Sequence, residues 1–416
     1  MKVLWITNTL FPDVCRELGI NIPVVEGWLY AGAKALMNDN DKIELAVASL
    51  YNGKEDKTLY LNGIYYFLSP KKNLNGKYDA KLETHWKSIQ NQFQPDIIHI
   101  HGTESPHGLA YVRACGKKNV VVSIQGLVSI CERYYYGGIT RLNLLKNTTI
   151  RDFVRLDTVF DQHTNMYNRG DWEKKMIQSV DHVIGRTLWD KVHLWAINPT
   201  ANYHFCNETL RNEFYQHKWE LDNCKEHSIF LSQAHYPLKG IHKVIEALPL
   251  IVRHFPDTKL YVAGNDFVTN RGWKLNGFGK YISSLIKKNG LTNKVIFTGS
   301  LSEESMCQQY LSSHVFVCPS SIENSSNSVG EAQLLGVPCV ASCVGGMTDL
   351  IAHNETGLLY RFEETEMLAN AVCEVFSNDI LAKRLSEKGR EVAISRHNSQ
   401  KNAQQLISIY ENIDGI

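Results

Sequence analysis

Short apolar runs rich in β-branched residues alternate with longer amphipathic segments along the whole chain. In the first half these runs occupy residues 3–6, 43–48, 96–100, 120–124 and 182–184, each separated from the next by enough chain for a helix. The alternation starts again in the second half, with runs at residues 228–231, 259–263, 294–297, 315–318 and 338–341. Strands that alternate with helices are typical of a parallel sheet covered on both faces. The pattern therefore predicts an α/β protein with two tandem, doubly wound, Rossmann-like domains.

A polar stretch separates the two sets of strands. Residues 198–226 are charged and fit neither the helical nor the strand period. We therefore predict an N-terminal domain at residues 1–205 and a C-terminal domain at residues 206–394, with the last helix, about 395–416, free to pack back on the first domain. Open parallel sheets bind ligands beyond the carboxyl ends of their strands, so the ligand site is expected in the cleft between the domains.

Composition and charge narrow the class of protein. The 416 residues are 44% hydrophobic and 21% charged, which is ordinary for a globular protein and excludes a disordered chain. The formal net charge is only +1, too small to indicate a nucleic-acid partner. The 10 cysteines include no Cys-x-x-Cys pair, which indicates a reducing compartment and no zinc site. Because no cleavage site follows the first apolar run and no run is long enough to span a bilayer, we expect a cytoplasmic protein.

One segment, residues 131–160, combines aromatic, apolar and basic side chains. It contains a tyrosine triplet, several leucines, and the cations Arg133, Arg141, Lys146, Arg151 and Arg155. Such a segment can lie on anionic lipid or hold a lipid-linked phosphate, which would give the N-terminal domain a peripheral contact with the inner face of the membrane. The alternative is an ordinary surface helix with a solvated basic face.

Two carboxylates in the second half are spaced for the recognition of hydroxyl groups. Glu323 lies in a loop of small residues after the predicted strand at 315–318, and Glu331 lies near the start of the helical run that follows. A carboxylate can accept from paired hydroxyls, so Glu331 suits the ribose of a nucleotide and Glu323 suits an attached sugar. Backbone N–H groups between them, at Ser328 and Val329 beside the helix N-terminus, can face a diphosphate.

This stretch resembles the signature of the retaining glycosyltransferases of family 4, which have the GT-B architecture and a Glu-x7-Glu motif. Glu323 and Glu331 match the two glutamates, and the surrounding matches are Pro319, Ser320, Ala332, Gly336, Pro338, Gly345 and Gly346. The resemblance is strong over residues 228–360 and weaker over residues 1–200. It implies two Rossmann-like domains with a cleft between them, the C-terminal one binding a nucleotide-sugar and the N-terminal one binding the acceptor.

A lysine near a helix start is the predicted ligand of the donor diphosphate. Lys239 precedes a predicted helix, where its ammonium group and the helix N-terminus both favour an anion. The resemblance gives Lys239 this role, and many relatives have an Arg six residues earlier. Here that position is Gln233, so one cation is missing, and Arg186 and Arg211 are the candidate substitutes.

Three further positions are expected to contact ligands. His101 lies at the carboxyl end of a predicted strand, where family members commonly have a His and an imidazole can bond a sugar hydroxyl or a phosphate oxygen; His99, on the same side of the strand, is expected to be packed. Relatives usually have paired glycines in the first loop, and of Glu26-Gly27 only Gly27 keeps that role here. The resemblance also places backbone groups at Gly299 against the base.

The activity implied by the resemblance is transfer of a sugar, from a UDP-sugar by preference, to an acceptor hydroxyl with retention of configuration. The leaving diphosphate, stabilised by Lys239 and helix amides, takes the acceptor proton, with Glu323 and His101 completing the catalytic set. No metal is expected, because no His/carboxylate cluster offers octahedral oxygen ligands. No other cofactor is expected, because the nucleotide-sugar is itself a substrate.

The acceptor stays open at this stage. Surface or capsular polysaccharide synthesis on a lipid-linked acceptor fits the sequence, and so does a soluble acceptor. Two other functions also remain: a nucleotide-sugar 2-epimerase of similar architecture, and a non-catalytic relative that binds a sugar nucleotide, for which Gln233 and Glu26 are the reasons.

Overall fold

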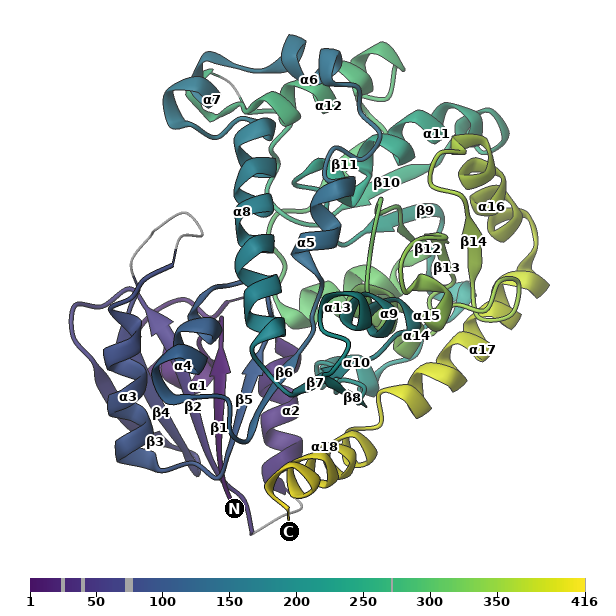
Figure 1. Ribbon diagram of the computed structural model, residues 1–416. Helices are drawn as coiled ribbons and strands as arrows, with labels where there is room; N and C mark the ends of the chain where they lie inside the picture. Colours follow the sequence, from purple (N-terminus) through teal and green to yellow (C-terminus); the bar gives the residue numbers. More distant parts are fainter. Residues whose placement is uncertain (24–26, 39–41, 72–77, 271, 416) are drawn as a thin grey trace. The chain divides into compact units, whose positions relative to one another are not determined.

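The described residues form two compact units. The computed structural model describes the chain except residues 24–26, 39–41, 72–77, 271 and 416. Unit 1 comprises Met1–Glu132, Asn165–Leu210 and His397–Ile416, and unit 2 comprises Arg133–Thr164 and Arg211–Arg396. Each unit is built on one sheet (Figure 1).

Unit 1 has an eight-stranded sheet in the order β3-β4-β2-β1-β5-β6-β7-β8. All neighbouring strands are parallel except the β3–β4 pair, which is antiparallel. Successive strands are added on one side of β1 up to β4, and on the other side from β5 onward, so the strand order reverses between β1 and β5. Doubly wound sheets bind their ligands at such a reversal. The strands are β1 (Lys2–Thr7), β2 (Glu44–Tyr51), β3 (Lys57–Leu61), β4 (Ile64–Pro70), β5 (Ile97–His101), β6 (Val120–Ser123), β7 (His182–Gly185) and β8 (Asn202–Phe205).

Helices cover both faces of this sheet and bury an apolar core on each. Trp86 and Tyr111 belong to one core and Trp5 and Tyr410 to the other. The indole N–H of Trp5 donates to the Tyr410 hydroxyl over 3.0 Å, which joins the last helix of the chain to the central strand of unit 1. Residues of the first core come from α3 (Leu82–Phe93), α4 (His107–Cys115), α8 (Val159–Gln178) and α9 (Leu188–Ile197), and residues of the second from α1 (Pro12–Glu17), α2 (Gly27–Asn38) and α18 (Ser399–Asp414).

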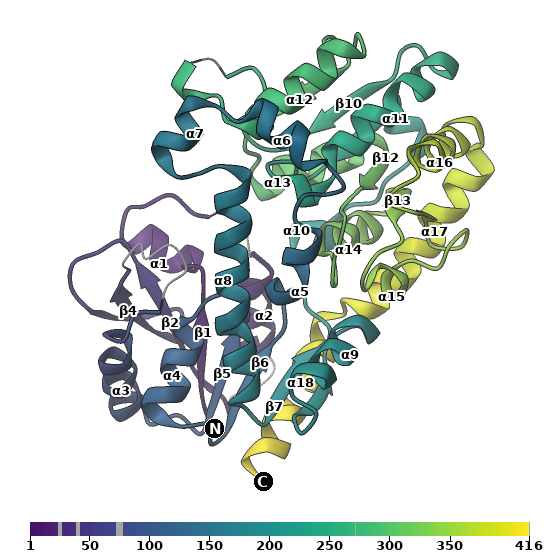
Figure 2. The ribbon, with the colours of Figure 1, turned by 45° about the horizontal axis from the view of Figure 1, so that its top comes forward.

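Unit 2 has a six-stranded, all-parallel sheet in the order β11-β10-β9-β12-β13-β14. The strand order reverses between β9 and β12: the chain leaves β9 toward one edge of the sheet and leaves β12 toward the other. Because both connections are right-handed, α11 after β9 and α14 after β12 lie on opposite faces of the sheet. There α11 packs on α16, and α14 packs on α17 (Figure 2). The strands are β9 (Lys225–Leu231), β10 (Lys259–Val262), β11 (Val295–Phe297), β12 (Ser313–Cys318), β13 (Cys339–Ser342) and β14 (Leu358–Tyr360). The main helices are α11 (Ile241–His254), α12 (Gly277–Lys288), α13 (Glu303–Leu311), α14 (Asn327–Leu335), α16 (Thr365–Ser377) and α17 (Asp379–Arg396).

Short helices complete both units. In unit 2, α6 packs on α12, on the outside of the sheet. The remaining segments are α5 (Val128–Cys131), α6 (Arg141–Asn147), α7 (Ile150–Arg155), α10 (Glu213–Gln216), α15 (Met347–Leu350) and the 3₁₀ turns η1 (Glu132–Tyr134), η2 (Leu221–Asn223), η3 (Pro237–Lys239) and η4 (Gly272–Lys274).

The predicted strands are all present, and the predicted α/β class with two Rossmann-like units is confirmed. The predicted linker at residues 198–226 is wrong in part, because it contains β8 and α10. Strand β8 has the sequence NYHF and lies at the edge of the sheet, with its two end residues exposed and its two middle residues half-buried. It therefore lacks the apolar run that marks a buried strand. The sequence also gave no sign of β3, β4 and β14.

Residues 133–164 pack in unit 2, although the sequence analysis placed them in the N-terminal domain at 1–205. Polar contacts with distant parts of the chain hold them there. The Ser321 hydroxyl donates to the Tyr134 carbonyl over 2.9 Å, and the His242 ring hydrogen-bonds the Gly137 carbonyl over 2.7 Å. Contacts of this kind leave no trace in hydrophobic periodicity.

Candidate functional site

A pocket of about 20 Å³ lies at the strand reversal of unit 2. Because β9 and β12 are neighbours with crossovers leading away on opposite sides, the residues that follow them line the same opening. We call it the unit 2 pocket. Its lining comprises Ser232, Gln233, Lys239, Phe316, Val317, Cys318, Pro319, Ser320, Glu323, Ser326 and Ser328.

Lys239 and Glu323 form an ion pair in this pocket. Lys239 Nζ lies 2.5 Å from Glu323 Oε1, which also accepts from the Ser320 hydroxyl over 2.8 Å. Burial lowers the pKa of Lys239, but the Glu323 carboxylate outweighs that effect and the net pKa is raised, so the ammonium stays charged. The ammonium has three donors, which leaves it able to bind an anion while it holds Glu323.

Gly240 allows the turn that carries Lys239 to approach the residue that follows β12. It has φ +73°, and a Cβ atom there would lie 1.7 Å from the carbonyl oxygen of Pro319. Only glycine fits such a contact, so the Lys239-Gly240 pair brings the lysine against the loop that carries Glu323.

Glu331 is held by Arg211. The guanidinium donates from Nε and Nη2 to the two carboxylate oxygens over 2.7 and 2.8 Å. Burial raises the pKa of Glu331, and Arg211 opposes that rise without cancelling it. Each carboxylate oxygen keeps a lone pair for a ligand hydroxyl. The predicted substitute cation Arg211 is therefore engaged by Glu331 and does not line the unit 2 pocket beside Gln233.

The first turn of α14 supplies backbone donors. Ser328 and Val329 lie at its start, and the Ser326 side chain at its N-cap makes no capping hydrogen bond. A helix N-terminus with free N–H groups attracts anions, in keeping with the predicted role of this segment. Gly299 follows β11 with φ +79°, and its carbonyl accepts from the Gly264 N–H over 2.9 Å.

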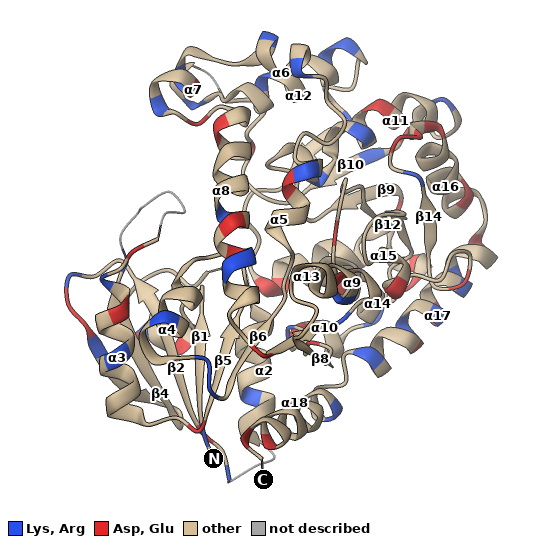
Figure 3. Cartoon of the chain, viewed as in Figure 1, with Lys and Arg blue, Asp and Glu red and all other residues tan. Residues whose placement is uncertain are grey.

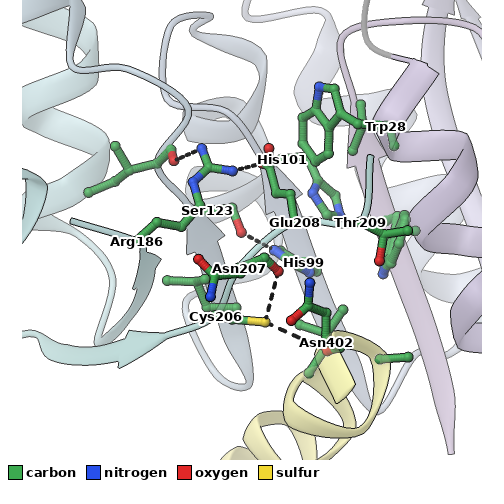
Figure 4. A pocket seen from close by; sticks show the side chains of 17 residues that line it. Trp28, His99, His101, Ser123, Arg186, Cys206, Asn207, Glu208, Thr209 and Asn402 are labelled. Atoms are coloured by element: carbon green, nitrogen blue, oxygen red, sulfur yellow. Dashed lines mark hydrogen bonds and ion pairs between the residues drawn. The ribbon is translucent and has the colours of Figure 1, made fainter. Parts of the chain in front are cut away.

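Unit 1 contains a larger cavity, of about 60 Å³, beside its own strand reversal (Figure 4). We call it the unit 1 pocket. Its lining includes Trp5 on β1, His101 on β5, Trp28 on α2 and Asn402 on α18. The Trp28 ring lies beside His101, with 6.2 Å between centroids (Figure 4). The remaining lining residues are Leu29, Gly32, His99, Ser123, Ile124, Ile184, Arg186, Cys206, Asn207, Glu208, Thr209, Ala403 and Leu406.

The two histidines of β5 differ in their surroundings. His99 is packed as predicted, since its ring nitrogens hydrogen-bond the Tyr410 and Ser123 hydroxyls, both over 2.6 Å. His101 lies against the Trp5 ring, with 4.3 Å between centroids, and neither of its ring nitrogens has a hydrogen-bond partner. Burial first, and then the neighbouring His99 and Arg186, lower the pKa of His101 well below its usual value. A neutral imidazole that can both donate and accept therefore faces the pocket.

An ion pair between Arg186 and Glu208 also lines the unit 1 pocket, and sequence reasoning missed its acidic member. Burial lowers the pKa of Arg186 to about 10, and Nη2 donates to the Ile124 carbonyl over 3.0 Å. Arg186 Nε and Glu208 Oε2 have no hydrogen-bond partner. A carboxylate just after a strand would have been a signal, but β8 itself was not predicted.

The predicted loop glycine lies at the border of the described residues. Gly27 is the first residue of α2, directly before Trp28 of the unit 1 pocket, and Glu26 lies outside the described residues. Over the part of the chain that the structure describes, no three His, Cys, Asp or Glu side chains gather in a way that could hold a metal ion. Among the same residues, no helix combines the length and the apolar character needed to cross a bilayer.

Comparison with known proteins bears on what these pockets do. Residues 212–392 match the family model of the group 1 glycosyl transferases. This segment therefore resembles a group 1 glycosyltransferase domain. It contains most of unit 2, including Lys239, Glu323 and Glu331.

One of two similar curated proteins matches the chain well beyond this segment. N-acetyl-alpha-D-glucosaminyl L-malate synthase of Bacillus anthracis is 24% identical over 350 residues, which are 81% of this chain and 80% of that protein. Spore coat protein SA of Bacillus subtilis is 28% identical over 178 residues, which are 42% of this chain and only 46% of that protein. The second match thus spans less than half of the relative.

Solved structures share the fold of both units. Sucrose-phosphate synthase of Thermosynechococcus elongatus superposes with a TM-score of 0.73, covering 99% of each chain at 17% identity. HepE of Anabaena, solved in complex with UDP-glucose, superposes with a TM-score of 0.66, covering 99% of this chain and 100% of that one at 13% identity. The two Rossmann-like units therefore have the GT-B fold, and the comparisons do not favour a 2-epimerase.

Proposed function

We propose that this protein is a retaining glycosyltransferase of the family 4 type, which moves a sugar from a nucleotide-sugar donor to an acceptor hydroxyl. The observation that carries the proposal is the Lys239–Glu323 pair, 2.5 Å apart at the strand reversal of a group 1 glycosyltransferase domain. Glu331 follows Glu323 with the Glu-x7-Glu spacing. A UDP-sugar is the preferred donor, because a solved structure of the same fold holds UDP-glucose.

Each candidate site residue of unit 2 has a role in this proposal. Glu331 accepts from the ribose hydroxyls, while Gly299 offers backbone groups to the base. Lys239 and the first-turn amides at Ser328 and Val329 bind the diphosphate. Glu323 accepts from hydroxyls of the transferred sugar.

The proposed reaction uses these roles. The bond between the anomeric carbon and the diphosphate oxygen breaks, and the acceptor oxygen bonds the anomeric carbon on the same face. The acceptor proton passes to the leaving diphosphate oxygen. Lys239 and the α14 amides balance the charge that develops on the diphosphate, so the proposed step uses neither an enzymic nucleophile nor a resident metal.

The unit 1 pocket is our candidate for the acceptor. Carbohydrates are recognised by aromatic rings together with side chains that exchange hydrogen bonds with hydroxyls, and this pocket offers Trp28, His101 and Glu208. His101 and Glu208 have ring nitrogens and a carboxylate oxygen without partners, so a sugar hydroxyl would satisfy buried polar atoms. Gly27 directly precedes Trp28 of this pocket in the chain. A lipid-linked glycan handled at the inner face of the membrane is the preferred acceptor class.

The first experiment is thermal stabilisation of the full chain by UDP, GDP, ADP, dTDP and CDP. A ligand present at 100 times its Kd adds about 2.7 kcal/mol of stability, which a melting curve resolves. A selective shift with one nucleotide identifies the donor base, and NMR of the anomeric proton in the product then distinguishes retention from inversion. No shift with any nucleotide would favour the non-catalytic alternative, in which Gln233 has cost the pocket its donor affinity.

A further inference from the structure

Helices α6 and α7 of unit 2 expose an unusual number of apolar side chains. Exposed large hydrophobic residues are scattered elsewhere among the described residues, but six of them fall within residues 142–156. We call the exposed residues of 141–156 the α6–α7 surface. Its apolar members are Leu142, Leu145, Ile150, Phe153, Val154 and Leu156, with exposed fractions of 57 to 77%. Contiguous apolar surface of this kind marks an interaction site in most proteins.

The exposure is built into the fold. Asp152 is buried and accepts from its own capping-box partner, the Thr149 N–H, over 3.0 Å, and from the Gly277 N–H at the start of α12 over 2.7 Å. Leu144 is also buried, so α6 directs one leucine inward and leaves two outside. Both helices are thus fixed to α12, and their remaining apolar side chains have no core to enter.

Every charged side chain exposed on this surface is a cation. Arg141, Lys146 and Arg155 are exposed, and Figure 3 shows Lys and Arg on α6 and α7. The one acid of residues 141–156, Asp152, is buried. The next acid along the chain, Asp157, has a side chain that is 41% exposed and pairs with Arg151, whose Nη1 lies 3.3 Å away.

A neighbouring turn extends the same character. The Thr149 hydroxyl donates to the Leu275 carbonyl over 3.3 Å, which brings η4 beside α7. Trp273 of η4 is 61% exposed, and Lys274 is exposed next to it. The whole surface therefore presents apolar and aromatic side chains interspersed with cations and no exposed acid.

We propose that the α6–α7 surface, with Trp273, docks the protein on an anionic lipid bilayer. Apolar side chains enter the boundary between headgroups and acyl chains, and Lys and Arg beside them bind anionic headgroups. The complementarity of charge favours lipid over a protein partner. The surface belongs to unit 2, so the membrane contact expected from residues 131–160 is carried by unit 2 and not by unit 1.

The test is co-sedimentation of the full chain with vesicles, one set of phosphatidylcholine and one with about a third of phosphatidylglycerol. The wild type is expected to bind the anionic vesicles at 0.1 M NaCl, to bind those of phosphatidylcholine at least tenfold more weakly, and to lose binding at 0.5 M NaCl. The double variant Ile150→Ser/Phe153→Ser should bind the anionic vesicles at least tenfold more weakly. The variant Arg141→Gln/Arg155→Gln should weaken partitioning about fivefold for each cation removed.

The matched control is Ile380→Ser/Met367→Ser, which removes two exposed apolar side chains from other helices of unit 2. It should bind like the wild type, and all variants should keep the wild-type melting temperature because the replaced side chains are exposed. The proposal is overturned if the wild type ignores anionic vesicles at 0.1 M NaCl or if the first variant binds as well as the control. It is equally overturned if that variant only dissolves a dimer in solution, which would make the surface a self-interface. Vesicle binding needs neither donor nor acceptor, so its failure is separate from a failure of the proposed transferase activity.

Discussion

Arg211 donates two hydrogen bonds to Glu331, one to each carboxylate oxygen, over 2.7 and 2.8 Å. Both side chains are almost buried, with exposed fractions of 11 and 9%. A buried pair of this kind gives modest net stability, but removal of one member leaves the other charged and unpaired. The pair therefore fixes the orientation of the carboxylate that we assign to the ribose.

The variant Arg211→Met should lose about 3 kcal/mol of unfolding free energy at pH 8. Its deficit should shrink as the pH falls to 5. Without Arg211 nothing opposes the effect of burial, so the pKa of Glu331 rises further above its value in the unfolded chain. The folded form then binds more protons than the unfolded form, and stability falls as the pH rises. Urea denaturation at the two pH values measures the loss of unfolding free energy.

The double variant Arg211→Met/Glu331→Gln should recover most of the unfolding free energy that Arg211→Met loses. A deficit independent of pH and of Glu331 would contradict the account.

Lys239→Ala should weaken the binding of the nucleoside diphosphate by about 1.5 to 3 kcal/mol, the usual contribution of a charged hydrogen bond. Glu331→Ala should also weaken nucleotide binding, whereas Glu323→Ala should chiefly lower turnover because its assigned partner is the transferred sugar. Isothermal titration with the nucleotide and steady-state kinetics separate these effects. Lys243→Ala is the matched control. This lysine lies in the first turn of α11, four residues after Lys239 and outside the unit 2 pocket, and pairs loosely with Glu246 at 3.8 Å. Equal nucleotide affinity in the Lys239 and Lys243 variants would refute the assignment.

Two glycines with positive φ should respond differently to alanine. At Gly240 the new Cβ would meet the Pro319 carbonyl oxygen at 1.7 Å, so the turn at Gly240 and the residue that follows β12 must move apart. At Gly299 a Cβ would meet no atom within 4 Å, and only the left-handed backbone opposes it, at about 1 to 2 kcal/mol. Gly240→Ala should therefore lose more unfolding free energy than Gly299→Ala, and lose nucleotide affinity as well, because Lys239 is its neighbour. Comparable losses in both would show that the close approach to Pro319 has little energetic weight.

The two histidines of β5 offer a further contrast. His101 has no hydrogen bond to lose, so His101→Asn should change stability by less than about 1 kcal/mol while lowering turnover about tenfold. His99→Leu breaks hydrogen bonds to Tyr410 and Ser123 and should lower stability by about 1 to 3 kcal/mol. Burial keeps the pKa of His101 well below its usual value, so the pH profile of turnover should show no ionisation from this residue near pH 6.5, where an ordinary histidine titrates. Denaturation and kinetics on both variants check this, and a marked loss of stability in His101→Asn alone would make that histidine structural.

The sequence predicted most strands of the two sheets and the main residues of the unit 2 pocket. Buried parallel strands must be apolar on both faces, so runs such as the one ending at Cys318 stand out, and the loop after that strand led directly to Glu323. The sequence alone does not distinguish the environments of His99 and His101, because both lie on the same side of β5. Their hydrogen-bond partners distinguish them, and one partner of His99, Tyr410, lies 311 residues away in the chain.

Other features had no local signal. Arg211 and Glu331 are 120 residues apart, and neither motif nor periodicity links them. Glu208 follows an edge strand that has no apolar run, and residues 133–164 join unit 2 through hydrogen bonds such as the one from Ser321 to Tyr134. Long-range polar pairing of this kind is decided by the folded geometry, which hydrophobic patterning does not encode.

Buried neutral histidines predict an acid limit to stability. His242 in α11 hydrogen-bonds the Gly137 carbonyl over 2.7 Å, and burial lowers its pKa to about 4. In the unfolded chain a histidine takes up its proton near pH 6.5. Between these values the unfolded form binds the extra proton, so stability is complete above pH 6.5 and falls by about 1.4 kcal/mol per pH unit as the pH drops toward 4. His242→Gln keeps a donor for Gly137 but cannot titrate. Its unfolding free energy should therefore fall less steeply over this pH window, by about 1.4 kcal/mol per pH unit.

The exposed His254, at the end of the same helix, gives the control variant His254→Gln, whose unfolding free energy should depend on pH as that of the wild type does. Identical slopes in both variants would mean that His242 is protonated, or opened to solvent, in the folded protein.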